Sequence, residues 1–305
     1  MGDWSLIQWL ALVEHELLLF AAAFFLWGAL DEFAVDLTWI SLKLTGRAKT
    51  EEISRAALTA RPLSGRAAVL IPAWQEAQVI EFTVAHALAA WPQRDLRIFV
   101  GCYANDPDTA EAVRRGAGGD ARVKVVVHER HGPTTKADCL NTLYAALERD
   151  QQHCGYHARM VVLHDAEDMV DPAALAVFDR ALEHAEFIQL PVLPEVQASS
   201  RWVGSHYCDE FAEDHGKAML VRQALAAAVP SAGVGCAIAR PVLRFMAAGG
   251  DGPFSVDSLT EDYELGLRIK AAGGRTRFVR ARGEDGRLVA TRACFPGRVD
   301  QAVRQ

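Results

Sequence analysis

Short apolar runs alternate with helix-like stretches through most of this 305-residue chain, and that alternation limits the folds open to it. Strands that alternate with helices form a mostly parallel sheet, with helices covering both faces. The runs that read as strands are Ala67–Ile71, Arg97–Tyr103, Val123–His128, Met160–Leu163 and Phe187–Val192. Stretches such as Thr135–Leu147 and Pro172–His184 read as helices between them. The sequence therefore predicts an α/β domain.

Polar segments follow four of these runs, at the point where each predicted strand ends. They are Pro72–Glu76 (PAWQE), Asn105-Asp106, His131–Lys136 and Asp165–Asp168. In parallel sheets, ligands bind beyond the carboxyl ends of the strands. A single such segment is commonly a helix N-cap and no more. Four of them at one sheet edge predict a binding site.

The fourth segment is the most acidic, with Asp165, Glu167 and Asp168 directly after an apolar run. Adjacent carboxylates repel one another and resist losing water, so they are tolerated in full solvent or around a cation. Magnesium or manganese, bound by one or two carboxylates together with substrate phosphates, suits this spacing. The alternative is a solvated helix N-terminus stabilised by the helix dipole. It explains Asp171, but it poorly explains Asp165, which closes a buried strand.

A second acidic pair opens a later helix. The stretch Ser258–Gly273 (SLTEDYELGLRIKAAG) has amphipathic spacing, with Thr260 as the expected N-cap and Glu261 and Asp262 in the first turn. Carboxylates at a helix N-terminus complement the dipole, so an isolated pair carries little weight. Beside a cation-binding cluster the pair gains a function. One carboxylate set can hold a metal-bound leaving group while the other acts as a base.

The first 50 residues differ from the rest. Leu17–Leu30 is uninterrupted apolar sequence, and LIQWLALV precedes it across Glu14-His15-Glu16. Together these segments can span the roughly 30 Å hydrocarbon core at 1.5 Å per residue. The following DEFAVDLTWISLKL predicts an amphipathic helix at the membrane interface. A buried helix of a soluble domain remains the alternative.

Charges flanking the apolar run predict its orientation. Lys43, Arg47 and Lys49 follow it, whereas only Asp3 lies before LIQWLALV and no lysine or arginine precedes the run. The positive-inside rule places the bulk of the chain in the cytoplasm. We therefore expect transmembrane and interface helices over residues 1–50 and a cytoplasmic domain over residues 51–305.

Composition and missing motifs exclude several classes. The net charge of −7 argues against nucleic acid as a partner. Six scattered cysteines without a CxxC pair suit a reducing compartment and offer no zinc site or disulfide framework. No GxGxxG follows the first predicted strand, which argues against a nicotinamide dehydrogenase. PAWQE stands where a nucleotidyltransferase would have a Gly-rich phosphate loop.

Six motifs, taken in order, resemble family 2 glycosyltransferases of the GT-A fold, in particular bacterial inner-membrane polysaccharide synthases. The motifs are VLIPAWQE, YANDPDT, GPTTKADCLN, LHDAED, SAGVGCAIAR and LTEDYELGLRI. Each alone is weak, but six in the same order are specific. The resemblance implies a Rossmann-like, mostly parallel sheet over residues 67–305 with helices on both faces.

The resemblance also implies roles on the donor side. It assigns Pro72, Glu76 and Asp106 to the uridine, Lys136 to the nucleotide or diphosphate, and Asp165, Glu167 and Asp168 to the metal–diphosphate complex. Asp165 and Glu167 occupy the DxD positions of the family. Glutamate replaces the second aspartate there but keeps the charge, and Asp168 is a substitute ligand.

On the acceptor side, the resemblance implies that Asp262 is the catalytic base and that Glu261 supports it. The residues implied near the acceptor are Gly233, Gly235, Arg240 and Gln305. Processive relatives carry QxxRW, and the chain ends in QAVRQ, so we expect Gln305 to be the first letter of that motif. The chain would then stop inside the motif, before further membrane helices and a part that senses cyclic di-GMP in relatives.

The implied function is an inverting, Mg- or Mn-dependent transfer from a UDP-sugar, expected to be a UDP-N-acetylhexosamine, onto a growing polysaccharide. The resemblance also implies two further partners, the lipid bilayer and an outer-membrane export protein. The alternative is a non-catalytic membrane scaffold or phage-receptor component that keeps a glycosyltransferase fold. The acidic DAED and TED motifs argue against the alternative, because a scaffold has no physical need for buried acids.

Overall fold

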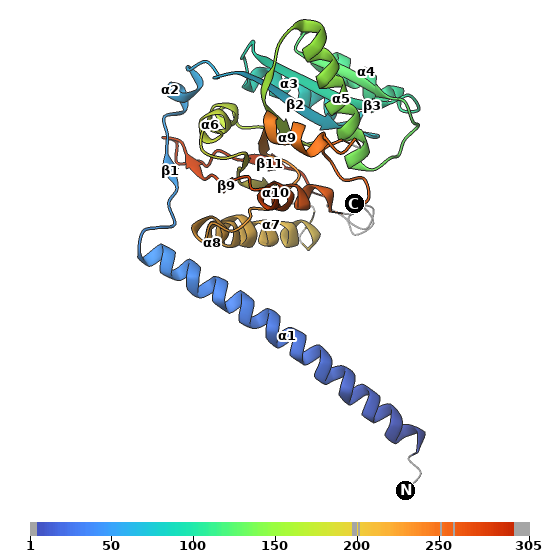
Figure 1. The fold of residues 1–305 in the computed structure, drawn as a ribbon, viewed down its shortest axis with the longest axis vertical. Helices are drawn as coiled ribbons and strands as arrows, with labels where there is room; N and C mark the ends of the chain where they lie inside the picture. The colour runs from blue at the N-terminus through green and yellow to red at the C-terminus, as the bar shows by residue number, and fades with distance from the viewer. Residues whose placement is uncertain (1–4, 197–199, 201, 251, 259, 296–305) are drawn as a thin grey trace. The chain divides into compact units, whose positions relative to one another are not determined.

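The structure is a computed structural model, and it describes residues 5–196, 200, 202–250, 252–258 and 260–295. The chain divides into two compact units, Met1–Ala48 and Lys49–Gln305. Each unit is described by itself below, and Figure 1 shows the order of their elements.

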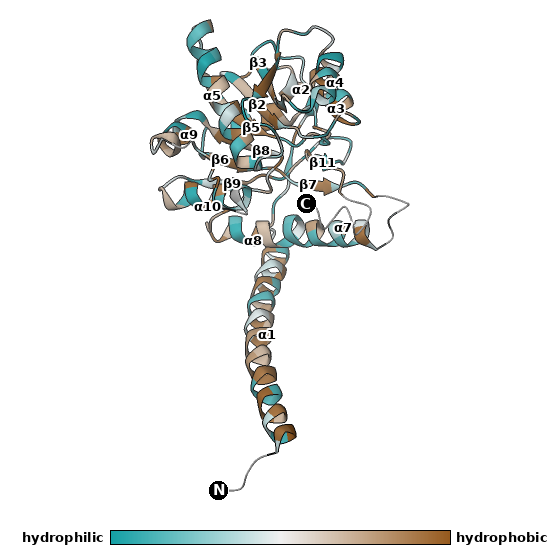
Figure 2. Ribbon diagram, turned by 90° about the vertical axis from the view of Figure 1, so that its right-hand side faces the viewer, coloured by the Kyte–Doolittle hydropathy of each residue, from teal (hydrophilic) through white to brown (hydrophobic). Residues whose placement is uncertain are grey.

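The first unit is one long helix, α1 (Leu6–Leu44). Ser5 caps it, because its hydroxyl accepts a hydrogen bond from the Gln8 backbone N–H and the Gln8 side chain accepts one from the Ser5 N–H. Figure 2 colours most of the helix as hydrophobic, and its large apolar side chains are exposed. By length and composition α1 can cross a membrane.

The helix is continuous where two helices were predicted. The amphipathic stretch after Leu30 extends the apolar stretch without a break. No proline interrupts residues 17–44, and Gly28 sits in open space within the helix. An interface helix separate from the apolar segment is therefore a wrong prediction.

Seven strands form the central sheet of the second unit, in the spatial order β4-β3-β2-β5-β8-β6-β9. Their bounds are β2 (Arg66–Pro72), β3 (Leu96–Tyr103), β4 (Val123–His128), β5 (Ala158–Leu163), β6 (Phe187–Gln189), β8 (Cys236–Ala239) and β9 (Thr276–Phe278). β4, β3, β2 and β5 are parallel, as predicted, and Val69 lies between Ile98 and Val162. β8 is antiparallel to both of its neighbours.

The last predicted strand is divided in two. β6 stays in the main sheet, whereas β7 (Val192–Pro194) pairs with β11 (Thr291–Ala293). Pro191 lies between them and has no N–H to donate to a ladder, which is a physical reason for the chain to change partner there. A further pair, β1 (Glu51–Glu52) with β10 (Ala281–Arg282), begins the second unit.

Helices cover both faces of the sheet, as Figure 1 shows. α3 (Ile80–Ala90), α4 (Pro107–Ala117) and α6 (Ala174–Ala181) share one hydrophobic core with alternate residues of β2, β3 and β5. α5 (Lys136–Cys154) packs on the opposite face, where Gly101 leaves room for Cys139 and Leu143. The remaining helices are α2 (Arg55–Thr59), α7 (Val203–Glu213), α8 (Met219–Ala224), α9 (Arg240–Ala247) and α10 (Glu261–Ala271).

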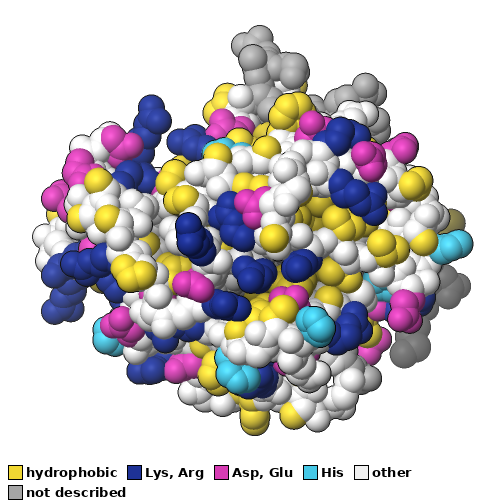
Figure 3. Space-filling view, turned by 90° about the horizontal axis from the view of Figure 1, so that it is seen from above, with side chains coloured by type: hydrophobic (Ala, Val, Ile, Leu, Met, Phe, Trp, Pro, Cys, Tyr) yellow, Lys and Arg dark blue, Asp and Glu magenta, His cyan; other side chains and the backbone are white. Residues whose placement is uncertain are grey.

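The surface carries its charge unevenly. On the face seen in Figure 3, Lys and Arg side chains gather across the middle. The net charge of −7 therefore describes the chain as a whole and not each of its faces.

A π-helix, Asp214–Ala218, joins α7 to α8 and buries His215. The Nδ1 atom of His215 accepts a hydrogen bond of 2.9 Å from the Val192 N–H, which requires an unprotonated Nδ1. Burial lowers the pKa of His215 to about 4, against an ordinary value of 6.5. The folded chain therefore keeps this imidazole neutral.

We expect stability to fall as the pH drops from about 6.5 towards 4, because the unfolded chain then binds a proton that the folded chain excludes. Between pH 7 and pH 5 the loss attributable to His215 should be about 2 kcal/mol. Urea unfolding of the detergent-solubilised chain and of His215→Asn at both pH values measures it. Equal losses in the two proteins would contradict the assignment.

Candidate active site

The carboxyl ends of β2, β3, β4 and β5 lie at one edge of the sheet, because these strands are parallel. β8 runs the opposite way, and its first residue, Cys236, pairs with Leu163 at the end of β5. The loop before β8 therefore reaches the same edge. α10 adds its first turn, which carries Asp262.

At the centre of this edge one ammonium group contacts two carboxylates. The Nζ atom of Lys136, the first residue of α5, lies 2.7 Å from Oδ1 of Asp165 and 3.8 Å from Oδ2 of Asp262. Burial acts to lower the pKa of Lys136, but Asp165 and Asp262 outweigh it and raise the pKa. Lys136 therefore carries its charge between the two acidic segments that the sequence singled out.

The loop before β8 passes directly beneath this group. Gly233 has a φ of +77°, and a Cβ there would lie 2.2 Å from Oδ2 of Asp262 and 3.2 Å from Nζ of Lys136. Only glycine combines this backbone conformation with so close an approach. Gly235, with a φ of +61°, similarly lies against the hydroxyl of Thr291.

Gln189 holds this loop in place, although sequence reasoning did not single it out. Its side-chain oxygen accepts a hydrogen bond of 2.9 Å from the Ala232 N–H, and its amide donates one of 2.9 Å to the Val234 carbonyl. The residue is completely buried at the end of β6. A lone amide within an apolar strand was the signal available in the sequence, because buried polar groups need partners.

Five carboxyl groups interact electrostatically around the ends of β5 and its neighbouring strands. Burial, followed by repulsion from Asp165, Asp168 and Glu76, raises the pKa of Glu167 to about 8. Burial and then Asp165 and Asp106 raise the pKa of Glu76. Mutual repulsion in a partly buried place is the condition that a bound cation relieves.

Asp168 has a different position from Asp165 and Glu167. It is 1% exposed, and its Oδ2 accepts hydrogen bonds from Nδ1 of His164 at 3.1 Å and from the Asp165 N–H at 2.9 Å. These bonds brace the turn after β5. The expectation that Asp168 is a substitute metal ligand is therefore corrected, because its carboxylate is buried and already paired.

The donor set left for a cation is Asp165 and Glu167, both half-buried. Two carboxylates fit Mg²⁺ or Mn²⁺, which are commonly completed by substrate phosphates and water. Within the ranges that the structure describes, no three His, Cys, Asp or Glu side chains are grouped so as to enclose a metal ion. A metal at this edge would therefore need oxygen atoms from a ligand.

The helix α3 and the residue after it hold the acidic turn from behind. The Thr83 hydroxyl donates to the Ala166 carbonyl at 2.6 Å, and the Trp91 indole N–H donates to the Asp171 carbonyl at 3.0 Å. Nε2 of His86 lies 2.9 Å from the Val170 carbonyl. No local pattern marked these side chains, because each partner lies about 80 residues away in the sequence.

The loop after β2 is held by the segment after β3. Asp106 accepts a hydrogen bond of 2.6 Å from the Gln75 N–H, and Gln75 has a φ of +60° that non-glycine residues rarely adopt. The Thr109 hydroxyl accepts one of 3.0 Å from the Glu76 N–H. Asp106 therefore positions the segment Pro72–Glu76 within the site.

An aromatic surface adjoins that loop. Trp74 packs on Gly132, where a Cβ would lie 2.4 Å from the indole ring, and Trp74 meets Tyr103 edge-on. Two hydrogen bonds fix Gly132 to Asn105. The Asn105 side-chain NH₂ donates one of 2.8 Å to the Gly132 carbonyl, and the Asn105 side-chain oxygen accepts one of 2.9 Å from the Gly132 N–H. The Tyr103 hydroxyl lies 2.7 Å from that of Thr134. The site thus combines a flat aromatic group with its acidic centre.

Some predicted site residues lie elsewhere. Arg240 follows the far end of β8, beside Tyr144, and its guanidinium pairs with Glu148. Since β8 is antiparallel to β5, it carries the chain from the site to the opposite sheet edge, so the acceptor-side assignment of Arg240 is corrected. Thr260 precedes α10 without forming the expected side-chain cap. The Glu261 side chain and Gln305 lie outside the described residues.

Comparison with known proteins relates this site to one family. Residues 65–305 match the glycosyltransferase like family 2. Bacteriophage adsorption protein B of Escherichia coli strain K12 and bacteriophage N4 adsorption protein B of E. coli O157:H7 are each 35% identical over 327 residues. Each alignment covers 99% of this chain and 44% of the relative, so the chain spans less than half the length of these proteins.

A solved structure has the same kind of fold. The mannosyltransferase PcManGT from Pyrobaculum calidifontis, in complex with GDP-Man and Mn²⁺, superposes with a TM-score of 0.53 at 19% identity. The match covers 89% of this chain and 70% of that one. With a GT-A-like fold and a family match over most of its length, the chain belongs to the family 2 glycosyltransferases.

Proposed function

We propose that the chain transfers a sugar from a UDP-sugar to a polysaccharide acceptor at the membrane, with inversion at the anomeric carbon. A UDP-N-acetylhexosamine is the proposed donor and Mg²⁺ or Mn²⁺ the proposed cofactor. The observation that carries this proposal is the meeting of Asp165 and Asp262 at Lys136. Asp165 would be the carboxylate that binds the metal, Lys136 the cation that binds phosphate, and Asp262 the separate carboxylate that acts as the base.

In this mechanism Asp262 removes the proton from an acceptor hydroxyl. The hydroxyl oxygen forms a bond to the anomeric carbon as the bond between that carbon and the UDP oxygen breaks on the opposite side. That geometry inverts the configuration. Gly233 supports the assignment, because its missing side chain lets the loop before β8 pack directly against the carboxylate of Asp262.

Lys136 and the acidic turn would bind the leaving group. Asp165 and Glu167 would hold the divalent cation, which supplies positive charge against the developing charge of the diphosphate. Lys136 would contribute a fixed ammonium at the same place. The raised pKa of Glu167 supports this assignment, because a carboxyl group under repulsion gains from a nearby cation.

The aromatic surface would receive the nucleobase. Trp74 is half-buried. The backbone next to it is held in place, because Asp106 accepts a hydrogen bond from the Gln75 N–H. A flat indole can stack on a pyrimidine ring, and such stacking contributes about 1–3 kcal/mol per base. The uridine would thus lie over Trp74 with its diphosphate towards Lys136.

The membrane setting rests on α1 and on charge. Lys43, Arg47 and Lys49 follow the apolar segment, which favours a catalytic domain on the cytoplasmic side. The residues 1–50 would form the membrane-proximal part and 51–305 the catalytic part. The curated relatives are named for bacteriophage adsorption. Growth of an exported polysaccharide, with an outer-membrane export partner, is the setting we propose for this chain.

For the proposed function, the first prediction concerns the base. Asp262→Asn should lower the rate of sugar transfer by about 10²–10⁴-fold, because a positioned base contributes that much. Binding of the UDP-sugar should remain, since the carboxamide keeps the shape of the site. UDP release in membranes, measured over a panel of UDP-sugars with Mn²⁺, tests this and identifies the donor.

Asp257→Asn is the matched control, because Asp257 is exposed and precedes α10. It should release UDP at the wild-type rate. Nuclear magnetic resonance of the product gives its anomeric configuration, and retention would contradict the mechanism. UDP binding without turnover in the wild type would indicate a missing acceptor. No UDP binding at all would favour a scaffold.

The second prediction separates two neighbouring aspartates. Asp165→Asn should weaken Mn²⁺ binding in the presence of UDP by tenfold or more, as followed by electron paramagnetic resonance of free Mn²⁺. Asp168→Asn should instead lower the free energy of unfolding by about 1–3 kcal/mol, because its oxygen can replace the acceptor Oδ2 but its NH₂ group is a new donor that is buried without an established partner. Loss of Mn²⁺ affinity in a stably folded Asp168→Asn protein would restore Asp168 as a ligand.

A further inference from the structure

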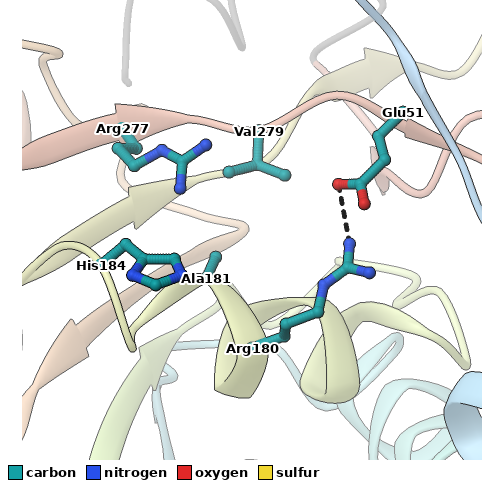
Figure 4. Close-up of a pocket in the computed structure, with 6 residues that line it drawn as sticks. All are labelled: Glu51, Arg180, Ala181, His184, Arg277 and Val279. Carbon is teal, nitrogen blue, oxygen red and sulfur yellow. Dashed lines mark ion pairs between the residues drawn. The ribbon is translucent and has the colours of Figure 1, made fainter.

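A cavity that shares no lining residue with the candidate active site lies between the end of α6, β9 and β1. Its volume is about 300 Å³. Figure 4 shows its lining residues, which are Glu51, Arg180, Ala181, His184, Arg277 and Val279. Ala181 and Val279 are buried, so the polar side chains stand around an apolar floor.

The charges around this cavity are unbalanced. Arg180 pairs with Glu51 at 2.7 Å, as the dashed line in Figure 4 marks. Arg277 and His184 lie on the other side of the opening, and within the described ranges neither side chain has an ion-pair partner. Arg277 is also half-buried, so its charge is less well hydrated than at an open surface. Two guanidinium groups and an imidazole therefore face one carboxylate.

A larger cavity elsewhere is less suited to an anion. It has a volume of about 710 Å³ and includes Arg159, Arg240 and Arg275 in its lining. Each of these already has an acidic partner. Arg159 pairs with Asp179 at 2.7 Å, Arg275 with Glu186 at 2.9 Å, and Arg240 with Glu148. Arg244, which also lines the larger cavity, lies 3.8 Å from Glu148, so each of its four arginines has an acidic partner, whereas Arg277 of the smaller cavity has none among the described residues.

The first lining residue of the smaller cavity, Glu51, follows α1 closely in the sequence. Only residues 45–50 separate the end of α1 from Glu51. Six residues span at most about 20 Å when fully extended. Backbone hydrogen bonds anchor this start of the domain, since the Glu51 N–H donates to the Arg280 carbonyl at 2.8 Å.

We propose that this cavity binds the phosphate group of an anionic molecule, with a phospholipid headgroup or free phosphate as its source. A guanidinium offers a planar pair of N–H donors that matches phosphate oxygens. Arg277 would supply an unpaired guanidinium, and Arg180 a second guanidinium that is shared with Glu51. His184 would supply a further N–H donor. Lys43, Arg47 and Lys49 would attract anionic lipids to the same region. The proposal is independent of the sugar-transfer chemistry.

Opposite changes in charge test the proposal. Arg277→Gln should weaken phosphate binding by tenfold or more, because it removes the unpaired guanidinium. Glu51→Gln should strengthen binding several-fold, because it removes the competing carboxylate and releases Arg180. Arg149→Gln is the control, since Arg149 is an exposed arginine on α5. A gain in Glu51→Gln cannot come from misfolding.

The full chain in neutral detergent is titrated by calorimetry with inorganic phosphate, dihexanoyl phosphatidylglycerol and, for comparison, dihexanoyl phosphatidylcholine. Binding of phosphatidylglycerol alone, lost in Arg277→Gln, supports the site and identifies a lipid headgroup. Binding of both phosphatidylglycerol and inorganic phosphate, with the same loss, supports recognition of the phosphate itself. Absence of binding, or equal affinity in wild type and Arg277→Gln, overturns the proposal.

Discussion

The ammonium of Lys136 is the group on which the active-site edge depends. It contacts Asp165 and Asp262, which belong to segments almost a hundred residues apart. Without a cation between them, these carboxylates would repel one another in a place that is partly shielded from water. The start of α5, the end of β5 and the first turn of α10 must therefore meet within a few ångströms. The rest of the domain supplies the strand directions and helix packing that bring them together.

Local patterns were sufficient to predict the parallel strands and the four polar segments that follow them. They were insufficient for β8, because the direction of a short strand depends on partners distant in sequence. That direction brings Gly233 beneath Asp262 and carries Arg240 to the opposite edge. One antiparallel strand thus places Gly233 and Arg240, which belong to the same motif SAGVGCAIAR, at opposite edges of the sheet.

Burial distinguishes residues that the sequence presents as equivalent. Three carboxylates stand within four positions, namely Asp165, Glu167 and Asp168. Their spacing alone does not distinguish a metal ligand from a residue that stabilises the turn. In the structure Asp168 turns inward to His164 and the backbone, whereas Asp165 turns to Lys136. Thr83, which binds the same turn from α3, was likewise invisible to local reasoning. Hydrogen bonds between distant segments decide which acid remains available for chemistry.

The balance of charge at the active-site edge constrains how a donor can bind. Among the described residues, Lys136 is the cation in contact with Asp165 and Asp262, and the raised pKa values of Glu76 and Glu167 show that further negative charge is unfavourable there. A diphosphate that entered alone would add negative charge to a site where carboxylates outnumber this cation. A divalent ion that arrives with the diphosphate changes the sign of that interaction. The same carboxylates that repel a bare nucleotide would then attract its metal complex, so under the proposed function the acidity of the edge would itself favour the metal-bound donor.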